Sequence, residues 1–450
     1  MTPWMFILNP LEPMLAEYPA TFDAWEAGGV RGIVIGRLLF EQDDGSTIRT
    51  FASDPGVYDS HGIAPPEPGP RDHRKEKQLH ALLDNAAGRG WKIMIFVSLP
   101  GAGDRPLAED PCGAVNYAAG LQDLMNAYPQ AHGQITDGPG ENHYEPTFHH
   151  GGHAFEVRNK WAPRYEAMGF DLERMQRGAT HLHNRLHALT PGSVRYHATG
   201  GMLAALSLFE LNEDAVYWLR AREKFAVSGV KAVRERIDQL SRRIQWGAIP
   251  RTAAFASLTG QNYGLMAPHL DYIFPKHYFW HRGFDGMYGT IARWVRTIGD
   301  WNPGLNQADC FAVVKALFGI ELPGVESLMD MEMGFPEAFF EQVVYQETRR
   351  ALEAVGDDDK VIAWISTGRS PHAGDAMPAH DLHHILKASA RGGLKRFVFH
   401  STFELGVPEW RVICNHSGGT WREDPAGYWP ADTQKPDAFG GGWRPTRYHH

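Results

Sequence analysis

The sequence has little cysteine. Its 450 residues include only Cys112, Cys310 and Cys414, which are widely separated and form no CxxC pair. Three scattered thiols cannot build a disulfide framework. We therefore expect ordinary buried thiols.

Long apolar runs and basic runs are also missing. No apolar run approaches the roughly 20 residues of a membrane-spanning helix, and the opening MTPWMFILNP lacks the basic start and long apolar stretch of a signal peptide. The composition predicts a soluble protein, either cytoplasmic or, if a signal peptide has been removed, secreted or periplasmic. A formal net charge of −9 without a basic run argues against nucleic acid or an anionic membrane as the main partner.

Several catalytic and cofactor motifs are absent as well. No GxGxxG or GxxxxGK[ST] follows the first predicted strand, which removes the usual nucleotide-binding alternative. No GxSxG elbow accompanies Ser366 or Ser401, so a serine triad is not expected. We expect no cofactor and no resident metal, and the sequence does not indicate an oligomeric state.

What the chain does contain is an alternation of strand-like and helix-like segments. Short runs rich in β-branched and aromatic residues predict strands at 4–8, 32–40, 92–99, 133–138, 252–258, 272–279, 361–366 and 396–401, with 194–198 as a ninth candidate. Helical patterns lie between them at 74–88, 114–128, 171–189, 213–246, 287–298, 336–355 and 379–391. Eight such alternations predict an α/β fold of the (β/α)8 TIM-barrel type.

The gaps between predicted elements suggest where the barrel is elaborated. We expect a catalytic barrel over 1–415 with insertions at 41–73, 139–250 and 280–335, and a loop-rich C-terminal extension over 416–450 that packs on it. In the long helix predicted within the second insertion, Val230, Val233, Ile237, Leu240 and Ile244 form one apolar stripe. Long βα loops build the active sites of barrels, so the function is expected among these insertions.

The densest polar stretch follows the fourth predicted strand and reads QITDGPGENHYE, residues 134–145. Asp137 closes the strand, and Gly138-Pro139-Gly140 allows a sharp turn that can bring Glu141 back over the same pocket. Two carboxylates about 5 to 10 Å apart are what glycoside hydrolysis requires, one ionised and one protonated. We therefore take Asp137 as candidate nucleophile or base and Glu141 as candidate acid, with Glu145 and Glu404 in reserve.

Other strand ends supply candidate substrate-binding residues. They are Arg37, Asn142, His143, Lys276, His277, Tyr278, Trp280, His281, Trp364, Arg369 and His400. Trp280 is expected to stack on a sugar ring, whereas Lys276, His277 and Tyr278 alternate in direction and cannot all point to one face.

Three of these candidates are cationic. Arg37, Lys276 and Arg369 converge on one barrel mouth and suggest an acidic or sulfated sugar, because Arg pairs well with planar anions. The alternative is that these bases neutralise Asp137, Glu141 and Glu404.

A histidine-rich segment, ENHYEPTFHHGGH, leaves a metal-based alternative open. His149 and His153 have the i, i+4 spacing of zinc helices, but Gly151-Gly152 and Pro146 disfavour a helix there. The first predicted strand also lacks the HxH of amidohydrolase-type metal barrels. The segment is therefore interpreted first as a hydrogen-bonding rim.

The strand followed by Asp137-Gly138 resembles the fourth strand of several (β/α)8 glycoside hydrolase families, including the α-fucosidases and the α-amylase and α-galactosidase groups. In those families the strand-four aspartate is the nucleophile, so the resemblance implies this role for Asp137 and makes Glu141 the candidate acid. The chain departs from the retaining families with paired glutamates, because WISTGRS stands where their strand-seven glutamate would be.

The predicted function is thus a glycoside hydrolase that acts on a poly- or oligosaccharide. A metal-dependent hydrolase or lyase that uses the cluster from His143 to His153 is one alternative. A non-catalytic glycan-binding barrel is the other.

Overall fold

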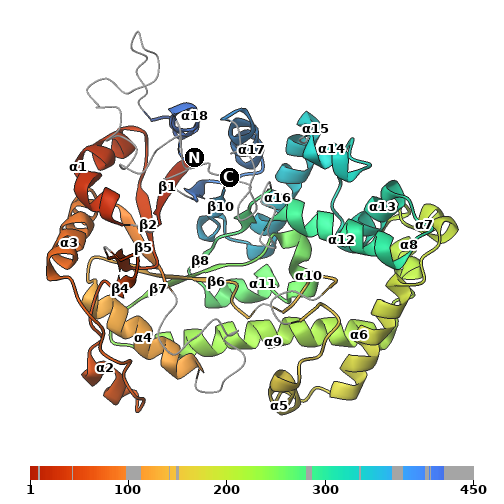
Figure 1. The fold of residues 1–450 in the computed structure, drawn as a ribbon, viewed down its shortest axis with the longest axis horizontal. Helices are drawn as coiled ribbons and strands as arrows, with labels where there is room; N and C mark the ends of the chain where they lie inside the picture. The colour runs from red at the N-terminus through yellow and green to blue at the C-terminus, as the bar shows by residue number, and fades with distance from the viewer. Residues whose placement is uncertain are drawn as a thin grey trace, which may run out of the picture.

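The computed structural model describes residues 1–8, 11–42, 44–97, 113–140, 142–147, 152–279, 286–333, 336–366, 379–400, 405 and 407–419. Within them, the main sheet consists of parallel strands surrounded by helices (Figure 1). Its strands are β1 (Thr2–Ile7), β2 (Gly32–Gly36), β5 (Lys92–Phe96), β6 (Gly133–Asp137), β7 (Gln245–Ile249), β8 (Tyr272–Ile273), β9 (Lys276–His277), β10 (Ala363–Ile365) and β11 (Arg396–Phe399).

The sheet closes on itself. Strand β1 pairs with both β2 and β11, and the order continues from β2 through β5, β6 and β7 to β8, and from β11 through β10 to β9. Strands β8 and β9 are one strand interrupted at Phe274-Pro275: Phe274 N–H donates to the Ala248 carbonyl at 2.8 Å, and the Pro275 carbonyl accepts from Trp364 N–H at 2.9 Å. The interrupted strand thereby joins both ends of the sheet, and the predicted (β/α)8 barrel is confirmed.

One predicted strand is wrong. Residues 252–258 form the turn Ala253–Phe255 and the short helix α10 (Ala256–Thr259), and the fifth barrel strand is β7. The predicted helix over 213–246 runs into the first two residues of β7, but α9 (Glu213–Ile237) ends at Ile237. Leu240 and Ile244 therefore continue its apolar spacing only by coincidence. Glycine is required at position 247 of this strand because a Cβ there would lie 2.6 Å from the Phe274 ring.

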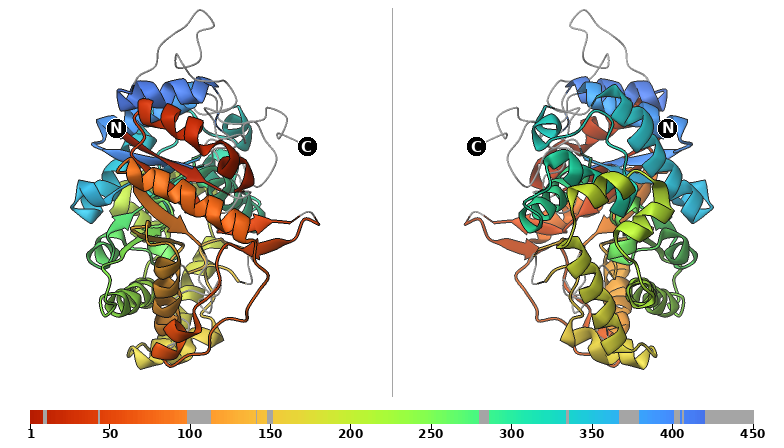
Figure 2. Two further views of the ribbon diagram at one scale, coloured as in Figure 1. Left: turned by 90° about the vertical axis from the view of Figure 1, so that its left-hand side faces the viewer. Right: turned by 90° about the vertical axis from the view of Figure 1, so that its right-hand side faces the viewer.

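Two further strand predictions change. The ninth candidate, 194–198, lies in helix α7 (Pro191–His197), which starts with a capping box at Thr190 and a proline in its first turn. Strand β2 stops at Gly36, short of the predicted residue 40, because Arg37 and Leu38 adopt φ angles of 58° and 48°. The chain then enters the hairpin of β3 (Leu39–Glu41) and β4 (Thr47–Arg49), which projects from the body of the molecule (Figure 2).

The predicted helices agree with the structure apart from the end of α9. They correspond to α3 (His73–Gly88), α4 (Gly113–Ala127), α6 (Leu172–Leu186), α9, α12 (Met287–Trp301), the run of α15 (Glu337–Phe339), a π-helical turn (Phe340–Val344) and α16 (Tyr345–Val355), and α17 (Ala379–Arg391). Further helices that were not predicted are α1 (Glu12–Ala27), α2 (Pro55–Ser60), α5 (Ala162–Ala167), α8 (Gly201–Leu208), α11 (Tyr263–Met266), α13 (Gln307–Phe318), α14 (Leu328–Glu332) and α18 (Val407–Ser417). Helix α1 lies beside α3 (Figure 2).

The barrel interior is packed with large side chains. It contains Trp4, Phe6, Val34, Met94, Ile135, Ile249, Tyr272, Phe274, Tyr278, Ile362, Trp364 and Val398. Aromatic residues of this size fit because glycine faces them: a Cβ at Gly32 would lie 2.7 Å from the Trp4 indole, and one at Gly36 would lie 2.5 Å from the Phe6 ring. Each buried aromatic side chain contributes about 1.5 to 3 kcal/mol through removal of apolar surface from water.

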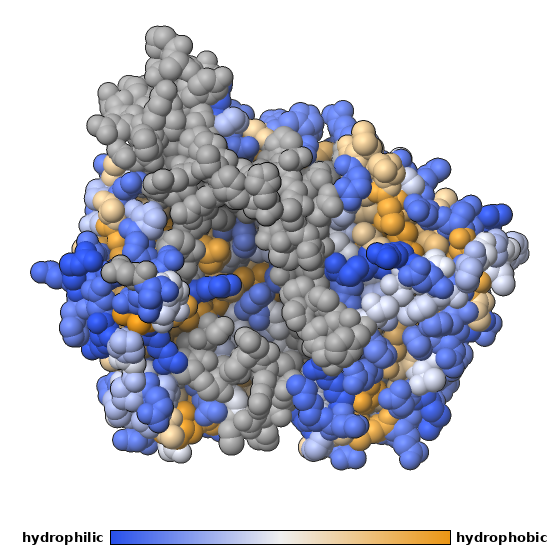
Figure 3. Space-filling model, viewed as in Figure 1, coloured by the Kyte–Doolittle hydropathy of each residue, from blue (hydrophilic) through white to orange (hydrophobic). Residues whose placement is uncertain are grey.

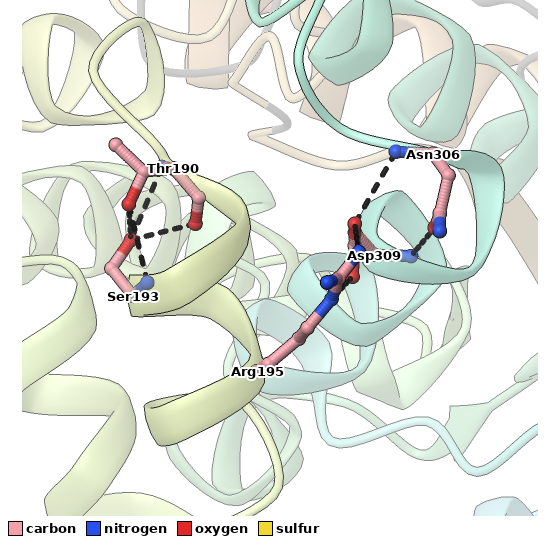
Figure 4. A network of polar contacts seen from close by, with 5 residues as sticks. All are labelled: Thr190, Ser193, Arg195, Asn306 and Asp309. Atoms are coloured by element: carbon pink, nitrogen blue, oxygen red, sulfur yellow. Dashed lines mark hydrogen bonds and ion pairs between the residues drawn. The ribbon is translucent and has the colours of Figure 1, made fainter.

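The insertions after the fourth and sixth barrel strands pack against each other. Arg195 of α7 donates to both carboxylate oxygens of Asp309 of α13 at 2.9 and 3.0 Å, and Asp309 also accepts from the backbone of Asn306 (Figure 4). Asn302, at the end of α12, accepts from Leu189 N–H at 3.0 Å. These bonds join helices that are more than 100 residues apart into one layer.

On the face viewed in Figure 3, hydrophilic residues predominate and hydrophobic ones lie in separate patches. Among the described residues, no helix has both the length and the apolar character needed to cross a bilayer. Cys310 and Cys414 are buried free thiols, as expected, and burial raises their pKa values to about 11 and about 12. Cys112 lies outside the described residues.

Candidate active site at the carboxyl ends of the barrel strands

Asp137 is the last residue of β6, the fourth barrel strand. The sharp turn expected after it is present: Gly138 and Gly140 have φ angles of 51° and 64°, a region that favours glycine. A Cβ at Gly140 would lie 2.7 Å from the Ala226 carbonyl oxygen, so the turn packs directly on the backbone of α9. The GPG sequence therefore fixes where the chain leaves the strand.

The Asp137 carboxylate forms an ion pair with Lys276 of β9. The Lys276 Nζ lies 2.8 Å from Asp137 Oδ1, and the lysine side chain is 2% exposed whereas the aspartate side chain is 47% exposed. Burial acts to raise the pKa of Asp137, but the charges of Lys276 and Arg251 outweigh it and bring this pKa below its ordinary value. Asp137 is therefore an ionised carboxylate with part of its surface accessible.

Arg251 is a site residue that the sequence pattern missed. It is 6% exposed and lies just after β7, where its backbone N–H donates to Gln261 Oε1 at 2.7 Å and its guanidinium lies 5.5 Å from the Tyr144 ring centroid. The error in the fifth strand explains the omission, because a strand at 245–249 would have placed Arg251 at a strand end. QWGAI followed by Pro-Arg was the available signal.

Aromatic side chains surround the inner part of this end of the barrel. Trp364 of β10 contacts Phe6 with ring centroids 4.9 Å apart and Phe96 at 5.7 Å. Tyr278 follows β9, and its ring centroid lies 5.2 Å from that of His400, which follows β11. Three of the predicted site residues, Trp364, Tyr278 and His400, are thus brought together.

The ring of His400 is held in one tautomer. Trp364 Nε1–H donates to His400 Nδ1 at 2.7 Å, and the Tyr278 hydroxyl lies 3.2 Å from the same nitrogen. Since indole is only a donor, Nδ1 is an acceptor and the proton resides on Nε2. Burial, reinforced by the charge of Lys276, lowers the pKa of His400 to about 4. His400 is therefore a neutral ring that offers an Nε2–H donor.

Arg37 lies at the carboxyl end of β2. Its side chain is exposed, and its backbone N–H donates to the Phe96 carbonyl at 2.7 Å. Two successive non-glycine residues with positive φ, Arg37 and Leu38, are uncommon and cost of order 1 to 3 kcal/mol each. Strain of this kind is often found at functional sites, so a role for Arg37 in substrate binding stays a prediction.

Asn142 and Glu145 make structural contacts. The Asn142 amide donates to the carbonyls of Arg222 at 3.2 Å and Thr259 at 3.1 Å, and its side chain is buried. Both carboxylate oxygens of Glu145 accept from Arg293 of α12, at 2.9 and 2.8 Å. We therefore assign the two residues to the scaffold of the insertion.

A second arginine that the sequence pattern missed, Arg222 of α9, organises the same region. It is 2% exposed and donates to the carbonyls of His143, Ala154 and Leu258, while its guanidinium lies 5.0 Å from the Trp218 ring centroid. Burial lowers its pKa to about 10. One buried cation thus supports the backbone on which the loop after β6 rests.

His277 does not share the environment of Lys276 and Tyr278. Its side chain is 1% exposed, and its ring centroid lies 5.2 Å from that of Phe279, which belongs to the core between the strands and the helices. Both ring nitrogens are buried without a hydrogen-bond partner, and burial lowers the pKa of His277 to about 4. Strand alternation accounts for the separation from its two neighbours.

The histidine-rich segment is divided among different partners. The His143 ring stacks on Trp161 with centroids 6.3 Å apart, whereas His153 lies 6.0 Å from His183 of α6. In the part of the chain that the structure describes, no group of three or more His, Cys, Asp or Glu side chains has the arrangement of a metal site. The predicted residues Glu141, Glu404, Trp280, His281 and Arg369, together with His149 and His150, lie outside the described residues.

No family model and no curated protein matches the sequence. Solved structures similar to it include a GH18 chitinase from Pseudoalteromonas aurantia, 10% identical over 92% of this chain and 100% of that chain with a TM-score of 0.39. A β-galactosidase from Marinomonas ef1 is 9% identical over 93% of this chain and 59% of that chain, with a TM-score of 0.48. A GH5_18 protein from Streptomyces cattleya is 11% identical over 95% of this chain and 83% of that chain, with a TM-score of 0.45. At these values the assignment of the barrel rests on this chain's own strand pairing.

Proposed function

We propose that this protein is a glycoside hydrolase whose active site lies at the carboxyl ends of the barrel strands. The observation that carries the proposal is Asp137: it ends the fourth barrel strand, is half-exposed, and is held ionised by Lys276 at 2.8 Å and by Arg251. An ionised, accessible carboxylate at this end of a barrel can attack an anomeric carbon or activate a water molecule.

The acid in this proposal is Glu141. It comes one residue after Gly140, whose positive φ and contact with α9 set the direction in which the chain leaves the turn. The separation of the two carboxyl groups then decides the outcome: about 5 to 5.5 Å gives retention and about 6.5 to 9.5 Å gives inversion.

The aromatic residues suit a sugar ring. Phe96, which is only partly buried, packs against Trp364 and Phe6 of the barrel interior, and a partly accessible aromatic face of this kind can pack against the C–H face of a pyranose. Beside them, the Nε2–H of His400 is a donor of fixed position for a hydroxyl oxygen. Apolar packing combined with one oriented donor is the pattern expected for carbohydrate rather than for a charged nucleotide.

We also propose that the sugar is acidic or sulfated. Lys276 forms an ion pair with Asp137, which is the alternative role expected for these cations. Arg251 adds a second positive charge near the same carboxylate. Two cationic side chains beside the candidate nucleophile favour an anionic substituent on the ligand.

The test compares Asp137→Asn with the parent chain on neutral, uronic-acid and sulfated polysaccharides, with release of reducing ends as the readout. We expect turnover to fall at least about 100-fold, the lower range for loss of a catalytic acid or base, while glycan affinity changes less than threefold. The matched control is Asp300→Asn, an exposed position on α12.

Three results would contradict the proposal. They are full turnover in Asp137→Asn, glycan binding by the parent chain without turnover, and loss of turnover in the parent chain on addition of a chelator. The second would indicate a binding barrel and the third a metal enzyme. Equal activity on neutral and charged glycans would reject the acidic-sugar part alone.

A further inference from the structure

A pair of histidines lies on α6 and its C-terminal end, in the helical layer formed by the insertions. His183 and His187 are spaced i, i+4, so their side chains lie on the same face of the helix. Their Nε2 atoms are 3.2 Å apart, and among the described residues neither ring makes another hydrogen bond. The two rings therefore already point toward one another.

The distance between the two nitrogens suits a shared metal ion. Imidazole nitrogens bind Zn²⁺ at about 2.0 to 2.1 Å. If both bonds are about 2.1 Å long, a nitrogen–metal–nitrogen angle of about 90° places the two nitrogens roughly 3.0 Å apart, and the tetrahedral angle places them roughly 3.4 Å apart. The observed 3.2 Å lies between these limits, so the separation of the two nitrogens matches the span of one shared ion.

Trp301, the last residue of α12, fixes the ring positions. Its indole stacks on His187 with centroids 4.0 Å apart and an interplanar angle of 24°, and it meets His183 edge-on at 5.2 Å. His187 is exposed and His183 is half-buried, so the facing nitrogens are accessible to a solvated ion. Packing against a large aromatic residue reduces the conformational entropy that the two side chains lose on binding.

Among the described residues, His153 also lies near the pair, but its Nδ1 is already engaged. This nitrogen accepts a hydrogen bond from Phe155 N–H at 3.2 Å. The His153 ring centroid is 6.0 Å from that of His183, compared with 4.5 Å between His183 and His187. His153 is therefore a neighbour of the pair and not a member of it.

We propose that His183 and His187 form a two-histidine site for a divalent transition-metal ion of the Cu²⁺, Ni²⁺ or Zn²⁺ type, with water in the remaining coordination positions. Imidazole ligands suit these ions, and Cu²⁺ binds most tightly in this series. The site is independent of the proposed glycosidase chemistry and uses none of its residues. Binding to the folded chain alone raises its stability through mass action.

The experiment titrates the full-length chain with Cu²⁺, followed by electron paramagnetic resonance, and with Zn²⁺, followed by calorimetry. We expect nitrogen hyperfine structure from two imidazoles, quenching of fluorescence that disappears in Trp301→Phe, and a rise of the melting temperature with Zn²⁺. Affinity should fall at least tenfold in His187→Ala, and the signal should be lost in His183→Ala/His187→Ala.

Two variants serve as controls. His153→Ala removes the neighbouring ring, and His181→Ala removes a histidine of α6 whose Nε2 contacts the Glu210 carbonyl at 2.7 Å. Both should bind Cu²⁺ within threefold of the parent. His449 and His450 are present in every variant, so their contribution cancels in each comparison.

Two outcomes would overturn the proposal. One is unchanged affinity in the double variant, which would place the metal elsewhere. The other is a loss in His153→Ala as large as that in His187→Ala, which would refute the two-histidine ligand set. Since His187 is exposed, its single variant should remain folded, and circular dichroism checks this before each titration.

Discussion

Replacement of His277 by leucine should reduce the acid sensitivity of this protein. The ring is 1% exposed, has no partner for either nitrogen, and has a pKa lowered to about 4 by burial. In the unfolded chain the same group titrates near its ordinary value of about 6.5. The unfolded state therefore binds more protons than the folded state between these two pKa values, and stability falls as the pH decreases through this window.

The magnitude follows from the two pKa values. A difference of about 2.5 pKa units corresponds to about 3.4 kcal/mol when the pH lies below both. Between pH 7 and pH 5, the same values give a loss of about 1.8 kcal/mol from this residue alone. At pH 7 the leucine variant should be at least as stable as the parent, because an unsatisfied buried polar group costs about 1 to 3 kcal/mol.

The assay is urea unfolding of parent and His277→Leu at pH 7, 6 and 5, with the difference in unfolding free energy as the quantity of interest. We expect the variant to gain about 1.8 kcal/mol relative to the parent between pH 7 and pH 5. The control is Asn184→Leu, at an exposed position that does not titrate, so its difference from the parent should not change with pH. A parent–variant difference that stays constant with pH would refute the reasoning, because it would show that the ring has the same pKa in the folded and unfolded states.

Two further predictions concern the candidate active site. Lys276→Met removes the main cation beside Asp137, so the pKa of the Asp137 carboxyl should rise. The acidic limb of the pH–activity profile should then shift to higher pH. An acidic limb at the same pH as in the parent would show that this carboxylate does not control turnover. Gly140→Ala adds a Cβ at positive φ and 2.7 Å from the backbone of α9, and should cost at least about 2 kcal/mol, measured by thermal unfolding; a smaller loss would mean that the turn can move away from the helix.

The alternation of strands and helices could be predicted from sequence because it depends on local composition. Seven of the eight barrel strands were found in this way, and the exception is instructive. The segment QWGAI of β7 is short and contains glycine, and it follows a helix whose apolar spacing continues past its end at Ile237. Only the Phe274 ring against Gly247 shows why the strand must pass there.

The candidate site was predictable in part for a similar reason. Asp137 and its GPG turn are adjacent in sequence, and glycine at positive φ is a local requirement, so the strand end and the turn could both be anticipated. Arg251 was missed because its place depends on the strand before it. The pairing of Asp137 with Lys276 joins residues 139 positions apart, which no local pattern specifies.

By itself the sequence determined the type of fold and the position of one carboxylate at a strand end, because backbone propensity and apolar periodicity act over a few residues. The tertiary structure decided which charges surround that carboxylate, and it separated the environments of neighbours such as Lys276 and His277. Adjacent strand residues face opposite sides of a sheet, and what lies on each side is set by the packing of distant segments. Burial and charge pairing, and with them protonation, are therefore properties of the folded barrel.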